Sequence, residues 1–173
     1  PVAGTIVKEK ENKLYGTHEF TLSNGARVIL KPTKAANDIL QLTAFSHGGT
    51  SLIPDEEYNN INAINALPGM GGLAHLTGRQ LGRALEGSTA SYQTNVGTLT
   101  ESFNGNCRWN DVEDLLQLMY LRFPTAPRQD TAAFHRWQQS MQSTVHQRME
   151  SPMTHFSDTL RSTMYQPHPR SRK

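Results

Sequence analysis

Alternating apolar and polar residues predict a β-hairpin near the start of the chain. Phe20 and Leu22 alternate with polar neighbours before Asn24-Gly25, and an extended apolar run resumes over residues 28–30. Asn-Gly is favoured in tight hairpin turns because both residues accept positive φ angles. The pattern therefore predicts two antiparallel strands joined at Asn24-Gly25.

Two further segments have the pattern of strands. Apolar residues at every second position over 39–46, ending at Gly48-Gly49, predict a central strand of a sheet. Residues 88–107 are rich in Thr, Ser and Tyr and divide near Gly97, which predicts a second hairpin.

Apolar residues spaced three and four apart predict helices over 58–67 and 73–85. Pro68 and the glycines that follow it interrupt this pattern, so we expect a flexible junction between two helices. Gly87 is a suitable stop for the second helix.

The clearest helix is predicted to begin at Asn110, with Asn110 as its cap and Glu113 reaching back, and to end at Pro124 and Pro127. Its buried face is predicted to comprise Val112, Leu115, Leu116, Met119, Tyr120 and Phe123.

Two more helices are predicted after it, one capped by Asp130 and one opened by Ser151-Pro152. Each has an apolar stripe, formed by Phe134, Trp137, Met141, Val145 and Met149 in the first helix and by Phe156, Leu160 and Met164 in the second.

Strands gather early in this order of elements and helices late. The order predicts an α+β fold, a two-layer sandwich in which an antiparallel-rich sheet carries helices packed on one face. We expect an N-terminal extension over 1–15, a single α+β domain over 16–167 and a frayed basic C-terminal tail over 168–173.

Composition narrows the class of protein. The 173 residues are 36% hydrophobic and 18% charged, and their net charge is +2 with basic residues scattered along the chain. This distribution argues against a nucleic-acid partner, and no apolar run approaches the roughly 18 residues of a membrane span. Cys107 is the single cysteine, so an internal disulfide is excluded. The chain does not begin with Met, and we expect a longer precursor.

The histidines do not form a recognisable zinc motif. Neither HExxH nor HxxEH occurs, and the nearest pairing at helical spacing is His146 with Glu150, which we interpret as a solvated helix face. The seven histidines are His18, His47, His75, His135, His146, His155 and His168.

Other candidate chemistry has a structural interpretation. Residues 69–74 match GxGxxA, but they do not lie between a strand and a helix as a dinucleotide site requires. We interpret Cys107 as a small packing residue. Trp109 and Trp137, together with the methionine-bearing helix faces, are expected to pack helices onto the sheet. The sequence thus predicts no catalytic, cofactor-binding or metal-ligating residue.

Several separated motifs resemble the insulinase/pitrilysin family of zinc peptidases. Residues 22–33 resemble the hairpin that opens domains of this family. Residues 111–123, 126–130, 156–160 and 168–170 resemble PqqL-like bacterial members, in the same order. The chain is identified on these motifs as similar to that family over residues 16–170.

The resemblance implies a metallohydrolase-like domain of a longer peptidase. Such a parent has four related α+β domains in two halves around a peptide chamber, and only the first domain holds zinc. This chain resembles the third, with sister domains and peptides as partners and a periplasmic or cell-envelope location. The family's HxxEH stretch matches His75 onward, but Gly78 stands at the base and Arg79 at the second histidine. His75 is then expected to be an ordinary helix residue.

Three functions follow from these observations. The first is a non-catalytic domain that helps to form the substrate chamber of a zinc metallopeptidase. The second is a stand-alone peptide-binding module that offers a strand edge. The third is an independent enzyme based on Cys107 or on a histidine cluster that the sequence pattern does not reveal.

Overall fold

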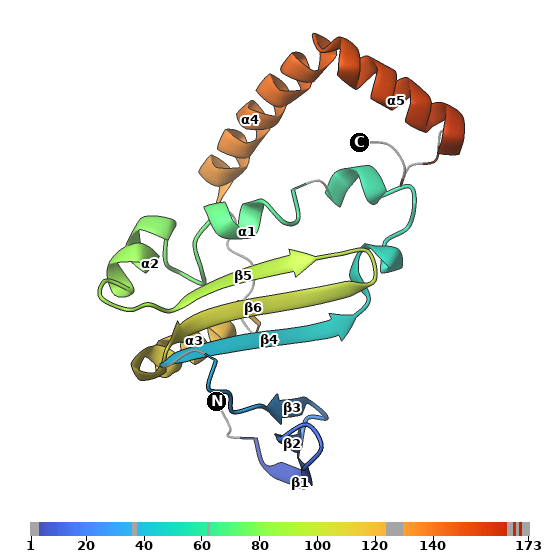
Figure 1. Cartoon of the computed structure of the whole chain (residues 1–173). Coiled ribbons are helices and arrows are strands. Elements are labelled where there is room, and N and C mark those ends of the chain that lie inside the picture. The colour runs from blue at the N-terminus through green and yellow to red at the C-terminus, as the bar shows by residue number, and fades with distance from the viewer. Residues whose placement is uncertain are drawn as a thin grey trace. The chain divides into compact units, whose positions relative to one another are not determined.

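The computed structural model describes residues 4–35, 38–61, 63–123 and 130–165, together with His168 and Arg170. The chain divides into two compact units, residues 1–38 and 39–173. Helices and antiparallel strands both occur, which confirms the mixed α+β class (Figure 1). A single domain over 16–167 stays a prediction.

The first unit is a three-stranded antiparallel sheet in the order β1-β2-β3. Its strands are β1 (Ile6–Asn12), β2 (Thr17–Leu22) and β3 (Arg27–Leu30). β2 and β3 form the predicted hairpin. β1 lies in the stretch predicted as an extension. Its Lys- and Glu-rich side chains are mostly exposed, so backbone pairing with β2 rather than burial makes it a strand.

The hairpin turn differs from the predicted one. The backbone N–H of Gly25 donates to the Leu22 carbonyl (2.9 Å), and that of Leu22 donates to the Ala26 carbonyl (2.8 Å). Gly25 has a φ of 83°, whereas Asn24 keeps a negative φ. Asn24 instead accepts the Ala26 N–H through its side-chain oxygen (3.0 Å). One residue with positive φ suffices because the loop is longer than a two-residue turn.

The second unit is built on an antiparallel sheet in the order β4-β6-β5. Its strands are β4 (Ile39–His47), β5 (Ser91–Val96) and β6 (Thr100–Arg108). The hairpin predicted over 88–107 is confirmed as β5 and β6. The prediction that β4 is central is wrong, because β6 pairs with both neighbours.

One face of this sheet is covered by helix α3 (Val112–Arg122), which follows the 3-10 turn η3 (Trp109–Asp111). Leu115 of α3 is fully buried, and a Cβ added to Gly105 of β6 would stand only 2.6 Å from its Cδ1. The glycine therefore lets the helix approach the strand closely. The buried cluster at this contact comprises Leu73, Ala90, Phe103, Cys107, Leu115 and Leu118. This packing of helix on one face of an antiparallel sheet agrees with the predicted sandwich.

The details of α3 differ from the prediction. Asn110 lies inside η3, the helix cap is Asp111, and its side chain makes no capping hydrogen bond. The Asp111 carboxylate instead accepts the backbone N–H (2.8 Å) and the hydroxyl of Thr89, two residues before β5. This contact ties the start of the helix to the sheet.

The buried face of α3 is also turned from the predicted one. Leu115 is buried, and Val112 and Met119 pack at the edge of the core. The unpredicted Leu118 is buried as well, whereas three predicted residues, Leu116, Tyr120 and Phe123, are exposed. Pro124 and Pro127, predicted to end the helix, lie outside the described residues.

The helices predicted over 58–67 and 73–85 are much shorter. Single turns occur at η2 (Tyr58–Ile61) and α1 (Leu67–Met70), and α2 spans Gly78–Ala84. Gly72 and Ala74 have φ values of 83° and 52°, which turn the chain sharply between α1 and α2. A helix cannot pass through two left-handed residues, so the second one begins later.

The last two helices are α4 (Thr131–Met149) and α5 (Pro152–Tyr165). The Asp130 cap is confirmed, since its carboxylate accepts the Ala133 N–H at 2.9 Å. The expectation that the tryptophans and methionine-bearing faces pack on the sheet is wrong for most of these residues. Trp109 is exposed, Trp137 is half-buried, and the apolar stripes of α4 and α5 are largely exposed beyond it.

Arg170 contradicts the expected frayed tail. Its guanidinium donates to the Thr50 carbonyl (2.9 Å) and the Ile53 carbonyl, pairs with Asp55, and lies 4.9 Å from the centre of the Tyr58 ring. Carbonyl groups in the turn η1 (Gly49–Leu52) and just after it match the planar donor fork of an arginine. Residues 171–173 lie outside the described residues.

The turn after β4 gives a stability prediction. Gly49 has a φ of 65°, and a Cβ there would lie 2.3 Å from the Gly97 carbonyl oxygen. Gly49→Ala should therefore lower the free energy of unfolding by about 1–3 kcal/mol because of backbone strain. The steric overlap of the new Cβ with the Gly97 carbonyl oxygen should add to this loss. Gly82→Ala is the control, because a Cβ inside α2 meets nothing within 4 Å. We expect Gly82→Ala to raise the free energy of unfolding by about 0.5–1 kcal/mol. Urea unfolding measures both, and equal effects would contradict the prediction.

The Thr89 contact gives a pH prediction. Hydrogen bonds from Thr89, helped by Arg108, hold the pKa of Asp111 below its usual range. The carboxyl of Asp111 therefore binds a proton less readily in the folded chain than in the unfolded chain. The stability that the ionised carboxylate contributes is fully present above a pH of about 4. It is lost as pH falls through the lower folded pKa. The stability difference between wild type and Asp111→Asn should shrink from about pH 6 to about pH 3, and a constant difference would refute the assignment.

Candidate functional site

The stretch that resembles a zinc motif is not a continuous helix. The backbones of Leu73 and Leu76 hydrogen-bond to each other at 3.0 and 2.9 Å, and His75 lies in the turn between them. α2 begins only at Gly78, where Thr77 and Gln80 form a reciprocal capping box. The expectation that His75 is a helix residue is therefore wrong. Its side chain and position 79 cannot present ligands from adjacent turns of one helix.

No group of three or more His, Cys, Asp or Glu side chains that could hold a metal occurs among the described residues. A ring nitrogen of His146 lies 3.3 Å from a carboxylate oxygen of Glu150, and both side chains are exposed, in keeping with a solvated helix face. The GxGxxA residues lie in and after the single turn of α1, away from any strand-to-helix junction. None of the described helices is long and apolar enough to cross a membrane.

Cys107 is confirmed as a packing residue. The thiol is buried in the core between sheet and helix. Burial raises the pKa of the Cys107 thiol, and the carboxylates of Asp111 and Asp114 raise it further. A thiol that keeps its proton is a weak nucleophile, so this environment opposes catalysis.

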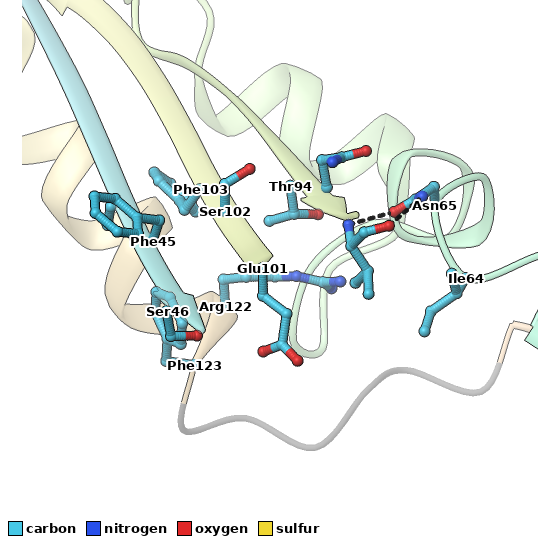
Figure 2. Close-up of a pocket in the computed structure, with 13 residues that line it drawn as sticks. Phe45, Ser46, Ile64, Asn65, Thr94, Glu101, Ser102, Phe103, Arg122 and Phe123 are labelled. Atoms are coloured by element: carbon cyan, nitrogen blue, oxygen red, sulfur yellow. Dashed lines mark hydrogen bonds between the residues drawn. The ribbon is translucent and has the colours of Figure 1, made fainter. Parts of the chain in front are cut away.

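The structure contains a pocket of about 340 Å³ at the end of the sheet beyond α3 (Figure 2). The strand register explains its floor, because Ala44, Phe103 and Thr94 form one row across β4, β6 and β5 on the face that α3 covers. α3 ends at Arg122 and leaves the end of this face open. The lining residues are Ala44, Phe45, Ser46, Ile64, Asn65, Thr94, Asn95, Val96, Glu101, Ser102, Phe103, Arg122 and Phe123.

Asn65 shapes one wall of this pocket. Its side-chain amide donates to the Val96 carbonyl (3.0 Å) and accepts the Val96 N–H (2.7 Å), as Figure 2 shows. The amide thus pairs with the outer edge of β5 as a neighbouring strand would. This double contact holds the segment after η2 against the sheet.

The pocket has the size and the lining of a binding site. Three phenylalanines, Phe45, Phe103 and Phe123, give it aromatic walls, and Arg122 and Glu101 add opposite charges. Its volume falls within the usual range of ligand pockets. None of its described lining residues is a histidine or cysteine. Such a pocket can hold an apolar side chain and a polar neighbour. Among the described hydrogen bonds, none joins a lining hydroxyl to Glu101, which instead accepts the Gly49 N–H at 3.3 Å.

Most of the opposite face of the sheet is polar, although Ile39 and Phe45 of β4 alternate onto it as well. Gln41 and Thr43 of β4 align with Asn106 and Asn104 of β6. Thr43 donates from its hydroxyl to the Asn104 side-chain oxygen (3.2 Å). Amide side chains both donate and accept hydrogen bonds, so this face can meet water or a peptide backbone.

Sequence reasoning did not find the pocket. It identified Phe45 and Phe103 only as apolar strand residues, and it expected Phe123 to be buried. Asn65 has no signal in the sequence, because its role depends on the Val96 edge 31 residues away. The alternation in the strands was the one available clue, since it places Ala44 and Phe103 on the face that a helix covers.

Comparison with known proteins finds zinc proteases. No protein-family model matches the chain. A protein of Arabidopsis thaliana described as "Zinc protease PQQL-like" is 25% identical over 165 residues, which are 95% of this chain and 15% of the relative. The "Probable zinc protease PqqL" of Haemophilus influenzae is 24% identical over 129 residues, 75% of this chain and 14% of the relative.

Two solved structures share the fold. The periplasmic protease PqqL from Escherichia coli superposes with a TM-score of 0.80 at 22% identity, covering 99% of this chain and 19% of that one. The ferredoxin protease FusC, solved in complex with Arabidopsis ferredoxin, superposes with a TM-score of 0.77 at 18% identity. This match covers 94% of the present chain and 18% of the FusC chain. The chain therefore spans less than a fifth of each of these relatives. The resemblance predicted from the motifs is confirmed: this chain is similar in sequence to PqqL-like zinc proteases and has the fold of a segment of the pitrilysin-type protease PqqL.

Proposed function

We propose that this chain is a non-catalytic domain of a longer zinc metallopeptidase, in which it helps to form the substrate chamber and docks to sister domains. The observation that carries the proposal is a pair of facts about the same residues. Between 75% and 95% of the chain matches zinc proteases while spanning 14–15% of their length, and its HxxEH-like stretch has Gly78 and Arg79 at two essential positions.

The geometry of that stretch supports a non-catalytic role. A hydrolytic zinc site needs about three protein ligands and a positioned base. Here His75 lies in a turn, and the capping box of Thr77 starts a new helix after it. Zinc in this proposal belongs to another domain of the parent chain. The placement as the third of four domains rests on the opening hairpin combined with the missing ligands.

The polar sheet face and the pocket support the role in a chamber. A chamber that confines peptides needs a wall that stays wetted and does not bind chains irreversibly. The face bearing Gln41, Thr43, Asn104 and Asn106 has this character. The pocket beside Phe103 adds a place for an apolar side chain. Confinement in such a chamber would keep a peptide near the active site. A periplasmic location is proposed by similarity to PqqL.

A specific observation favours a peptide-binding module as the second candidate. Because Asn65 contacts the outward N–H and C=O of Val96, the alternation of the ladder turns those of Tyr92 and Thr94 outward too. The described hydrogen bonds leave the outward groups of Thr94 without a protein partner. A peptide could add to this edge and place a side chain in the adjoining pocket.

The primary proposal is tested with the purified chain. After dialysis against zinc and removal of the excess, it should hold less than one zinc per chain and leave a fluorogenic unstructured peptide intact. A zinc peptidase assayed in parallel is the positive control. Stoichiometric zinc with chelator-sensitive cleavage would overturn the proposal. Activity that is lost in Cys107→Ala would instead support the independent cysteine enzyme, which the buried, protonated thiol opposes.

The peptide-binding candidate predicts saturable binding of labelled extended peptides. Thr94→Pro removes an edge N–H without removing a ladder hydrogen bond, and should weaken binding by about 10-fold. Thr94→Ala keeps the N–H and is the matched control. Fluorescence anisotropy measures both. No saturable binding, or equal loss in the two variants, would leave a purely structural wall as the better account.

A further inference from the structure

Helices α4 and α5 each carry an exposed apolar stripe. In α4 the stripe residues Met141 and Val145 are 38% and 53% exposed, and in α5 Phe156 and Leu160 are 64% and 48% exposed. Amphipathic helices of soluble proteins normally turn such a stripe toward a core. Apart from the half-buried Trp137, and with Met153 added to the predicted set, the exposed stripe residues are Phe134, Met141, Val145 and Met149 in α4 and Met153, Phe156, Leu160 and Met164 in α5.

The two helices are held at defined points. Ala133, in the first turn of α4, is buried, and the Asp130 cap fixes the helix start beside α1. At the junction with α5, Arg148 pairs with Asp158 at 3.3 Å, and a ring nitrogen of His155 lies 2.9 Å from the Met149 carbonyl oxygen. The stripes between these points therefore belong to a fixed pair of helices.

Exposed apolar stripes of this length mark an interaction surface. Four of the six methionines of the chain lie in α4 and α5, namely Met141, Met149, Met153 and Met164. Methionine side chains adapt to irregular partners, so the surface suits a large apolar contact. Arg148 of α4 is paired with Asp158, the one acidic residue of the two helices. Arg136 and Arg161 then leave the surface with positive charge, which favours acidic groups at the rim of a partner.

We propose that the stripes of α4 and α5 are the docking surface for a further segment of the same polypeptide. That segment presents an apolar surface with an acidic rim. This inference rests on the proposed function, because it requires a parent chain longer than these 173 residues. The matched relatives are about five to seven times longer than the matched region. A segment tethered in the same chain has an effective concentration near the millimolar range, which favours it over a second copy.

Hydrogen exchange of the full polypeptide and of the 173-residue chain tests the docking. Amides of α4 and α5 should exchange at least about 10-fold more slowly in the full polypeptide, because docking suppresses local opening. Val145→Gln and Leu160→Gln should remove this protection. Ser143→Gln and Ser162→Gln place the same side chain on the opposite helix faces and should preserve it.

Two results would overturn the proposal. Equal exchange in the two wild-type proteins would mean that nothing in the parent covers the stripes, and this comparison holds even if a variant fails to fold. Protection that rises with the concentration of the 173-residue chain would identify a second copy as the occupant. Zinc content and peptide cleavage of the full polypeptide are measured in parallel. Protection of the α4 and α5 amides without zinc binding or peptide cleavage would sustain the docking surface while refuting the peptidase function.

Discussion

The contact between Leu115 of α3 and Gly105 of β6 is the constraint on which the second unit depends. No side chain larger than hydrogen fits at Gly105 without displacing a fully buried leucine. The close approach lets Phe103, Cys107 and Leu118 share one apolar cluster. Burying a side chain such as Leu115 or Phe103 stabilises the fold by about 1.5–3 kcal/mol. A three-stranded sheet has little else to hold a helix.

Two polar contacts extend this constraint to the ends of the sheet. Asp111 binds Thr89 at the start of α3, and Asn65 binds both backbone groups of Val96 at the far end of β5. Between these contacts the helix covers the sheet, and beyond its last residue it does not. The pocket beside Phe103 is therefore a consequence of the length of α3. Its walls combine core-facing strand positions, Ala44, Thr94 and Phe103, with Phe123 just after α3 and Phe45, which alternates to the other face of β4.

The surfaces of the unit differ according to the roles proposed for them. The outer sheet face carries mostly amides and hydroxyls, which tolerate water and can meet a peptide backbone. The stripes of α4 and α5 carry methionine, leucine and phenylalanine, which water does not stabilise. A wall facing a chamber and a surface facing a neighbouring domain would need these opposite properties. Arg170, bound to the carbonyls of Thr50 and Ile53, returns the chain from the helices to the turn beside the sheet.

The sequence alone determined the features that depend on neighbouring residues: the hairpins at Gly25 and Gly97, the helix cap at Asp130, the α+β class and the family resemblance. Local turn chemistry and side-chain periodicity carry these signals. Tertiary structure decided which strand is central, which face of α3 is buried, where the helices over 58–85 break, and how Asn65 and Arg170 are bound. Those outcomes depend on contacts between distant residues, such as Asn65 with Val96 and Gly105 with Leu115. Local periodicity shows that a face is apolar, but only packing determines what covers it.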